Sequence, residues 1–316
     1  MVLSEHHFIL GGSGFIGRHV AIELARQGHK VLLAGRRPLL QAFPADFASR
    51  ISWQFLELGS ADWDTLIADV DVVHHYAWGS LPASANANPG GDLRTNVGAM
   101  IDLLDALQRR GSGKIIFTSS GGTVYGKLHQ TPVPENHPVA PINAYGAGKA
   151  TAEIYLSLYR AMHGIDCRIA RVANPYGAGQ NLSHGQGAVT TFIHRALNRL
   201  PITIWGDGEV IRDYIFIQDV AKFLVMLAAA PPNPEFIFNV GSGVGLSLNA
   251  IVDALEIRLG RKLEVTRSAA RSIDIPVSIL SIERAAKIIG WSPITPFPEG
   301  ISRTLDDMSR GADVSM

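Results

Sequence analysis

Short apolar runs alternate with amphipathic segments along the first half of the chain. The runs are HFIL at 7–10, KVLLA at 30–34, ISWQFL at 51–56, DVVHHYA at 71–77, KIIFTS at 114–119 and CRIARVA at 167–173. Their near-continuous apolar character is typical of strands buried on both faces of a sheet. Between them, residues 98–109 and 144–163 place apolar side chains at helical spacing. The pattern predicts an α/β fold with a doubly wound, parallel sheet.

The pattern changes after about residue 175. A turn-rich stretch, NPYGAGQNLSHGQG, is followed by shorter strands and helices, among them ITIW, EFIFNVG and LEVTR. We therefore expect a second, smaller, mixed α/β domain built from 175–213 and 241–316. The first domain would comprise 1–174, with the chain returning to it at about 214–240.

Composition narrows the class of protein. Lys and Arg number 28, as do Asp and Glu, so the chain has no net field that would attract nucleic acid or an anionic membrane. Cys167 is the only cysteine, which excludes an internal disulfide, and its apolar surroundings predict a buried, inert thiol. No apolar run reaches the length of a membrane-spanning helix. These features predict a cytoplasmic globular protein.

A glycine-rich turn follows the first predicted strand. The stretch GGSGFIG occupies 11–17, with glycines at 11, 14 and 17. Such glycines permit a tight turn, bring the backbone close to a pyrophosphate, and let the next helix pack on the strand. The helix N-terminus then presents free N–H groups to the anion. We expect a dinucleotide here, in a domain of the Rossmann type, with contacts from Gly11, Ser13, Gly14, Phe15, Ile16 and Gly17.

The end of the second strand indicates which dinucleotide binds. NAD sites of this type carry an acidic residue there for the ribose 2′-hydroxyl. This chain has Gly35 followed by Arg36 and Arg37, and two guanidinium groups could hold a 2′-phosphate. The sequence therefore favours NADP over NAD as the cofactor.

Residues 145–149 read YGAGK, which places Tyr145 and Lys149 one helical turn apart on one face. A nearby ammonium stabilises a phenolate, so we expect the pKa of Tyr145 to fall toward working pH, for proton transfer with a carbinol or a ketone. Upstream, FTSSGGTVYG at 117–126 ends a strand in several hydroxyl side chains.

Together these three features resemble the extended short-chain dehydrogenases/reductases, and later motifs resemble those of NAD(P)-dependent nucleotide-sugar epimerases and dehydratases such as UDP-galactose 4-epimerase. The stretches HHYAW at 74–78 and TNVGAM at 95–100 are similar to cofactor-lining motifs of that family. The resemblance implies a Rossmann domain and a nucleotide-sugar-binding domain. It also implies further cofactor contacts from Glu57, Leu58, Ala77, Asn96, Ser119, Tyr145, Lys149 and Val172.

The second half carries the family's substrate motifs. The stretches RVANPYG at 171–177 and GDGEVIRDYIFIQDV at 206–220 are similar to segments that bind a sugar diphosphate. The resemblance implies a nucleotide-diphosphate sugar, UDP-type above others, bound by Asn174, Val189, Trp205, Arg212, Arg271 and Asp274. The arginines would bind the diphosphate, which suits their bidentate geometry; Asp274 would bind the ribose and Trp205 would stack on the base.

The family oxidises C4 of the sugar and then diverges. Its dehydratases carry an Asp-Glu pair where this chain has Gly122 and Thr123, and neither of these can act as acid or base. A nucleotide-sugar 4-epimerase of sugar-nucleotide or surface-polysaccharide metabolism needs no further groups. An NADPH-dependent 4-keto-sugar reductase is the alternative, and a non-catalytic NADP sensor is a third.

Two points stay open in the sequence. The family's catalytic hydroxyl position falls on Gly121 when counted from the V-Y-G motif, but on Ser120 when counted from Tyr145. Ser120, Thr123 or neither could supply that hydroxyl. The histidines show no metal-binding spacing, so no metal is expected. The family's dimers pair two helices per subunit, here 98–110 and 144–163, which implies a homodimer.

Overall fold

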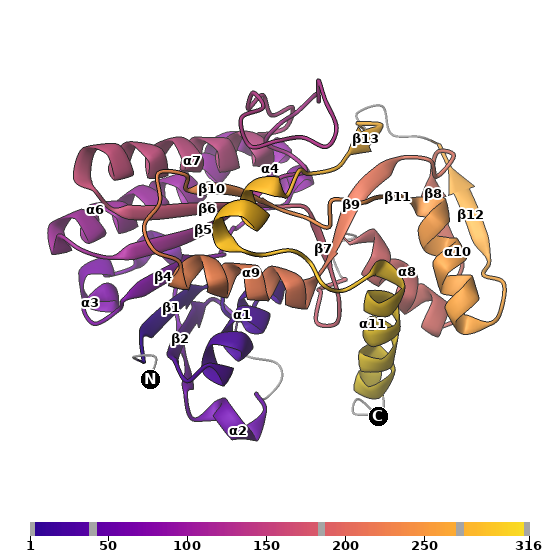
Figure 1. Ribbon diagram of the computed structural model, residues 1–316, viewed down its shortest axis with the longest axis horizontal. Coiled ribbons are helices and arrows are strands. Elements are labelled where there is room, and N and C mark those ends of the chain that lie inside the picture. Colours follow the sequence, from indigo (N-terminus) through magenta and orange to yellow (C-terminus); the bar gives the residue numbers. More distant parts are fainter. Residues whose placement is uncertain (1–3, 38–42, 183–186, 270–274, 313–316) are drawn as a thin grey trace. The chain divides into compact units, whose positions relative to one another are not determined.

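The structure, a computed structural model, describes residues 4–37, 43–182, 187–269 and 275–312 (Figure 1). The chain divides into two compact units. Unit 1 comprises 1–127, 136–172 and 221–238, and unit 2 comprises 128–135, 173–220 and 239–316.

A sheet of seven strands forms the centre of unit 1, in the order β10-β6-β5-β4-β1-β2-β3. Its strands are β1 (His6–Leu10), β2 (Lys30–Gly35), β3 (Ile51–Phe55), β4 (Val72–His75), β5 (Lys114–Ser120), β6 (Asp166–Val172) and β10 (Ile237–Val240). Neighbours from β3 to β6 pair in parallel. The order reverses between β1 and β4, so the predicted doubly wound sheet is confirmed.

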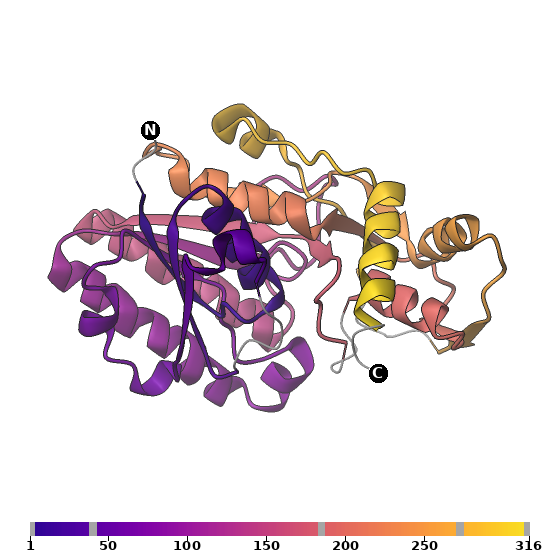
Figure 2. The same cartoon turned by 90° about the horizontal axis from the view of Figure 1, so that it is seen from below.

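Helices cover both faces of this sheet. They are α1 (Phe15–Arg26), α2 (Ala45–Ala48), α3 (Trp63–Ile67), α4 (Pro82–Ala87), α5 (Pro89–Leu93), α6 (Ala99–Arg110), α7 (Ala144–His163) and α9 (Ile217–Ala229). A 3₁₀ turn spans Leu58–Ser60, and a π-helical turn over Arg94–Gly98 leads into α6. Figure 2 shows α6 and α7 on one face of the sheet, with α1 and α9 on the other.

Strand periodicity produces the core under α6 and α7. Alternate residues of each strand point to this face, and they bury Phe8, Leu10, Val73, Ile115, Phe117, Cys167 and Ile169. The helices contribute Met100, Leu103, Leu104, Leu107, Ala152 and Leu156. The prediction of a buried Cys167 is confirmed, and burial raises the pKa of its thiol to about 12.

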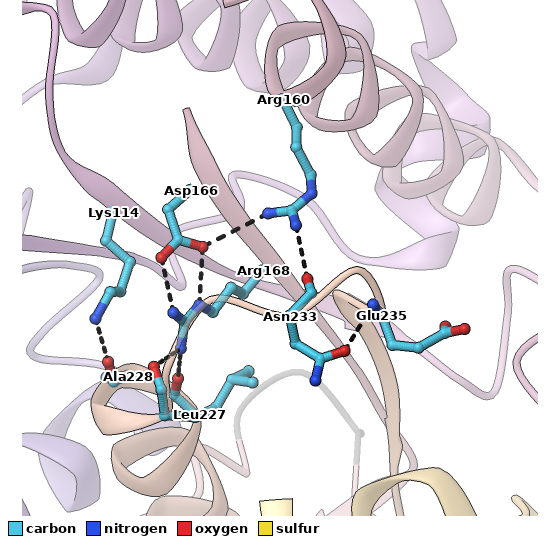
Figure 3. Close-up of polar contacts among 9 residues, drawn as sticks. Lys114, Arg160, Asp166, Arg168, Leu227, Ala228, Asn233 and Glu235 are labelled. Atoms are coloured by element: carbon cyan, nitrogen blue, oxygen red, sulfur yellow. Dashed lines mark hydrogen bonds and ion pairs between the residues drawn. The ribbon is translucent and has the colours of Figure 1, made fainter. Parts of the chain in front are cut away.

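Cations from two strands hold the C-terminal end of α9 (Figure 3). Arg168 on β6 and Lys114 on β5 donate to the carbonyl oxygens of Leu227, Ala228 and Ala230. Asp166 accepts two hydrogen bonds from Arg168, at 2.7 and 2.9 Å. The carbonyls at a helix end have no partner within the helix, and the negative end of the dipole favours cations. This contact therefore fixes α9 against β5 and β6.

Unit 2 is a mixed α/β unit. It contains β7 (Asn174–Tyr176), α8 (Ala188–Leu197), β8 (Ile202–Trp205), β9 (Ile211–Phe216), β11 (Gly245–Ser247), α10 (Leu248–Leu259), β12 (Val265–Ser268), β13 (Val277–Ser278), a π-helical turn at Ala285–Ile289, and α11 (Phe297–Ala312). β9 pairs with β7, β11 and β13, whereas β8 pairs with β12.

The unit boundaries differ from the predicted domain boundaries at 128–135 and 214–220, both of which belong to unit 2. The first difference has a long-range cause. Val133 donates its N–H to Ile279 at 2.8 Å and bridges to Leu280, and residues so far apart in sequence cannot be paired by local pattern. Among the described helices, none has the length and apolar character to cross a bilayer.

Candidate active site

The glycine-rich turn brings three backbone segments into close contact. Gly11 has φ +80°, and a side chain there would put Cβ 2.8 Å from the backbone nitrogen of Ala77. A Cβ at Gly17 would lie 2.4 Å from the carbonyl oxygen of Gly11. The N-cap of α1, Gly14, makes no side-chain cap, and the first turn has no acidic residue. This leaves a helix N-terminus with free N–H groups for a pyrophosphate, so the turn fits the dinucleotide that the sequence predicts.

The residues expected to select the nucleotide lie at the carboxyl ends of β2 and β3. An added Cβ at Gly35 would lie 3.6 Å from Oγ of Ser13, so the glycine turn and the end of β2 are neighbours. Arg36 and Arg37 are exposed. Glu57, also exposed, and the half-buried Leu58 follow β3. Both arginine side chains are therefore available to an anion.

Asn96 has protein partners at both ends of its amide. Its Oδ1 accepts from the N–H of Gly79 at 2.7 Å, and its Nδ2 donates to Oδ1 of Asp92 at 2.8 Å. Asp92 also accepts a short hydrogen bond from Oγ of Ser80. Asn96 was predicted to contact a cofactor. Its hydrogen bonds hold the turn after β4 against the start of α6, and the predicted cofactor contact stays a prediction.

The catalytic pair predicted from sequence lies on α7. Asn143 caps the helix by accepting from the N–H of Gly146 at 2.8 Å, which starts the helix one residue before Tyr145. Lys149, one turn later, is buried, and its Nζ donates to the carbonyl of Thr118 on β5 at 2.8 Å. The two side chains thus share one face of the helix, as expected.

Aromatic rings surround the ammonium of Lys149. Its Nζ lies 4.0 Å from the ring centroid of Trp78 and 4.7 Å from that of Phe117, close enough for cation–π attraction. Trp78 also contacts Tyr145 edge to face, with centroids 6.3 Å apart. A Cβ at Gly148 would lie 3.1 Å from Cζ2 of Trp78, so glycine at this position lets α7 approach the ring. Sequence reasoning missed Trp78, although it belongs to the quoted HHYAW stretch.

The pKa values differ from the expectation. Burial, together with the charge of Asp92, raises the pKa of Tyr145 to about 12, whereas a fall was predicted. Burial lowers the pKa of Lys149 to about 7, against the opposing attraction of Glu153 and Asp92. The physical reason is that Nζ lies 5.9 Å from the Tyr145 ring centroid and donates to Thr118 instead. Desolvation therefore outweighs the attraction between the pair.

The candidate hydroxyls lie in a tight turn after β5. The carbonyl of Ser120 accepts from the N–H groups of Thr123 and Val124, at 3.2 and 3.1 Å. Ser119 Oγ and Thr123 Oγ1 are buried without a hydrogen-bond partner among the described residues. A Cβ at Gly146 would lie 2.7 Å from the carbonyl oxygen of Thr123, which places this turn beside the first turn of α7. A Cβ at Gly122 would meet nothing within 4 Å, so open space adjoins the turn.

Two further charged residues were missed by sequence reasoning. Glu153 on α7 and Arg171 on β6 form a buried ion pair with Nη2–Oε2 at 2.6 Å. Val172, which follows Arg171, accepts through its carbonyl from the N–H of Gly121 at 2.9 Å. The signal was present, since Glu153 lies one turn beyond Lys149 and Arg171 begins the quoted RVANPYG stretch. A spacing alone did not show that the two meet.

Unit 2 brings together two predicted substrate residues. Asn174 on β7 donates Nδ2 to the carbonyl of Asp213 on β9 at 2.8 Å, beside Arg212. Arg212 is half-buried and donates to the carbonyl of Ile211 at 2.9 Å. Trp205 ends β8 with 45% of its surface exposed, so its ring is available for stacking.

The other predicted substrate residues are Val189, Arg271 and Asp274. Val189 is buried in α8, so its side chain does not face solvent. Arg271 and Asp274 lie outside the described residues.

A cluster that local spacing did not reveal forms across neighbouring strands. Glu5, His7 and His29 each place one potential ligand atom within 4.8 Å of the others. His29 Nδ1 accepts from the N–H of Glu5 at 3.2 Å, and Nδ1 of His7 contacts Nε2 of His74 at 2.9 Å. The nearby charge of Lys114 acts on His7. This positive charge disfavours a cation beside His7, and the expectation of no metal stays a prediction.

Comparisons with known proteins cover nearly the whole chain. The sequence model of the NAD dependent epimerase/dehydratase family matches residues 7–241. A UDP-glucose 4-epimerase of Mycolicibacterium smegmatis is 33% identical over 306 residues, which cover 94% of this chain and 96% of that protein. A dTDP-4-dehydro-6-deoxyglucose reductase of Escherichia coli is 30% identical over 304 residues, which cover 94% and 95% of the two. The crystal structure of a Thermotoga maritima UDP-glucose 4-epimerase with UDP-glucose superposes with a TM-score of 0.89 at 28% identity, covering 97% of this chain and 99% of that one.

Proposed function

Because the chain belongs to the NAD dependent epimerase/dehydratase family, we propose that it is a nucleotide-sugar 4-epimerase whose substrates are UDP-sugars. The observation that carries this proposal is the half-buried Tyr145 and the buried Lys149 on one face of α7, beside a turn that lacks a second acid or base. Gly122 and Thr123 occupy the positions where a dehydratase needs its Asp and Glu, so proton transfer is confined to one site.

In the proposed reaction, the protein transfers a single proton, that of the hydroxyl group on sugar C4. The glycine turn would hold a nicotinamide dinucleotide, which would supply reversible hydride transfer at sugar C4. Tyr145 Oη takes the proton of the C4 hydroxyl and gives it back to the 4-keto oxygen, so the protein gains and loses none over a cycle. The ammonium of Lys149 stabilises the phenolate, and the rings of Trp78 and Phe117 stabilise that ammonium in a buried site. Inversion requires that the keto sugar present its other face before hydride returns.

The variant Tyr145→Phe, which lacks the phenol oxygen, tests the role of Tyr145 in proton transfer. Tyr145→Phe keeps the ring beside Trp78 but cannot transfer a proton, so we expect the conversion of UDP-glucose to UDP-galactose to fall by about 10²–10⁴-fold. Rates would be followed by NMR of the sugar protons, and dinucleotide affinity by fluorescence titration. Affinity should stay within a factor of about two. A variant with full activity would contradict the mechanism.

A second candidate is a nucleotide-4-keto-sugar reductase. The similarity to the Escherichia coli reductase favours it, as do the exposed Arg36 and Arg37, which suit exchangeable NADPH. The two activities differ in redox balance. An epimerase consumes no dinucleotide over a cycle, whereas a reductase oxidises one NADPH for each sugar. Nicotinamide absorbance during turnover separates them, and a sensor would bind dinucleotide without turning over any sugar.

We also propose that NADP is preferred to NAD. The family is named for NAD, but β2 ends in Gly35 with no acidic side chain, and Arg36 and Arg37 are exposed beyond it. Replacing both arginines by alanine should raise the Kd for NADP⁺ about 10-fold and leave that for NAD⁺ unchanged. Arg50→Ala, at another exposed arginine of unit 1, is the matched control. Equal weakening of both dinucleotides would refute the preference.

A homodimer through α7 completes the proposal. Ile154, Leu158 and Met162 recur at four-residue spacing on this helix and expose 65%, 43% and 64% of their surfaces. Such a stripe on one helix fits a second copy of the same helix packed by two-fold symmetry.

A further inference from the structure

Arg171 makes contacts in two directions from the carboxyl end of β6. Toward α7, its Nε donates to both carboxylate oxygens of Glu153 at 3.1 Å, and its Nη2 donates to Oε2 at 2.6 Å. Toward the turn after β5, its Nη1 donates to Oη of Tyr125 at 2.9 Å. Arg171, Glu153 and Tyr125 are 3%, 4% and 1% exposed, so these bonds are shielded from water.

These contacts join the two segments that carry the reacting groups. Glu153 follows Lys149 by one turn of α7, and Tyr125 lies two residues after Thr123. The guanidinium is planar and donates in fixed directions, so it holds both segments at a set spacing. The ring of Tyr125 lies 4.8 Å from the Arg171 guanidinium, which adds packing to the hydrogen bond.

The pair also sets the charge beside Lys149. The ion pair with Arg171 holds the carboxylate of Glu153 one helical turn from Lys149. The negative charge of Glu153 raises the pKa of Lys149 against the larger effect of burial. The ion pair thus supports the ammonium that the proposed reaction requires.

We propose that Arg171 and Glu153 are positioning residues for the proposed C4 chemistry: their ion pair holds the Glu153 carboxylate one helical turn from Lys149 and fixes the turn that carries Thr123 against α7. This inference rests on the proposed function, because the charge of Lys149 matters only if Tyr145 transfers a proton. The hydrogen bonds of Arg171 described above go to Glu153 and Tyr125, so the pair acts on the reaction through Lys149 and the turn.

Glu153→Gln tests the electrostatic part, because it removes the charge and keeps the shape. Tyr145 and Lys149 titrate as a coupled pair, and the reactive form carries one proton, on Lys149. Without Glu153, Lys149 loses its proton at lower pH. A larger share of the protein that carries one proton on the pair then holds it on Tyr145, beside a neutral Lys149, and this form is not the reactive one. We expect the acid limb of the kcat profile to move down by about one pH unit and its plateau to fall about 10-fold. Rates at pH values below the limb should be unchanged.

Conservative and paired variants complete the test. Glu153→Asp keeps the charge, and its profile should retain the wild-type midpoint. If Glu153→Gln folds poorly, the double variant Glu153→Gln/Arg171→Met removes both charges together and avoids a lone buried charge. Its profile should shift in the same direction but by less, because the loss of the Arg171 cation partly offsets the loss of the Glu153 anion. A rate loss that is equal at all pH values would overturn the proposal. If the wild-type protein turns over no nucleotide sugar, the proposed function itself has failed.

Discussion

At the scale of single residues, the site depends on an ammonium held in a poor environment for charge. Lys149 is buried, and its Nζ donates to the carbonyl of Thr118 and lies near the rings of Trp78 and Phe117. Desolvation is the larger effect, and the pKa of Lys149 falls to about 7. A group near neutrality can exchange protons during turnover more readily than an ordinary lysine.

Burial of Lys149 makes stability depend on pH. The lysine pKa is about 7 in the folded protein and 10.5 in the unfolded chain, so the unfolded chain binds more protons between these values. Above pH 10.5, Lys149 is neutral in both states and its burial does not reduce the free energy of unfolding. As the pH falls from 10.5 to 7, the free energy of unfolding decreases, and this part of the stability is lost once the pH is below 7. We expect Lys149→Met to be more stable than wild type at pH 6, and this advantage to shrink by pH 9. Urea unfolding at both pH values measures it; a constant difference would contradict the lowered pKa.

The catalytic hydroxyl can be tested at two adjacent positions. Thr123 Oγ1 is buried without a partner among the described residues and lies in the turn beside α7, whereas Ser120 is half-buried and uses its carbonyl to close that turn. We expect Thr123→Val, which keeps the shape, to lower kcat by about 10–100-fold. Ser120→Ala should change kcat less than about threefold. The reverse order of effects would assign the hydroxyl to Ser120.

At the scale of elements, polar contacts at helix ends and along helix faces place the helices against the sheet. α7 begins at the Asn143 cap and is fastened by Lys149 to β5 and by Glu153 to β6. α9 is fastened at its other end, where Arg168 and Lys114 satisfy carbonyls that the helix leaves free. In each case, polar contacts between helix and sheet fix where the helix lies along the sheet, which apolar packing alone would not determine.

Removing the α9 anchor should cost stability. Arg168 is buried and bonds Asp166 as well as the helix end. Arg168→Met therefore leaves the helix-end carbonyls without this donor, and leaves Asp166 with its longer ion pair to Arg160, at 3.6 Å. We expect a loss of about 3 kcal/mol in the free energy of unfolding, by comparison with other broken buried pairs. Arg258→Met, in an exposed pair with Asp306, is the control and should cost less than about 1 kcal/mol. Equal losses in denaturant titrations would show that the helix end does not depend on Arg168.

At the scale of the whole molecule, one apolar stripe has no partner in the described chain. Ile154→Asp/Met162→Asp places two charges in the proposed dimer contact on α7 and should weaken self-association by at least about 100-fold. Ile257→Asp on α10, where the side chain is 83% exposed, is the control and should leave the mass unchanged. Light scattering over a concentration series measures both. A wild-type protein that is monomeric at every concentration would refute the dimer.

Local patterns sufficed for much of this protein. The alternation of apolar runs and helical spacing predicted the parallel sheet and α7 at 144–163. Strands buried on both faces are apolar at consecutive positions, so the sequence itself shows them. The glycine turn and the one-turn separation of Tyr145 from Lys149 were also readable, since each depends on residues near one another in sequence. Only the tertiary structure decided the direction of the Tyr145 pKa, the rings around Lys149 and the Glu153–Arg171 pair. These features depend on which residues far apart in the sequence come into contact and on how far water is excluded from them. The periodicity of apolar residues gives no information on either.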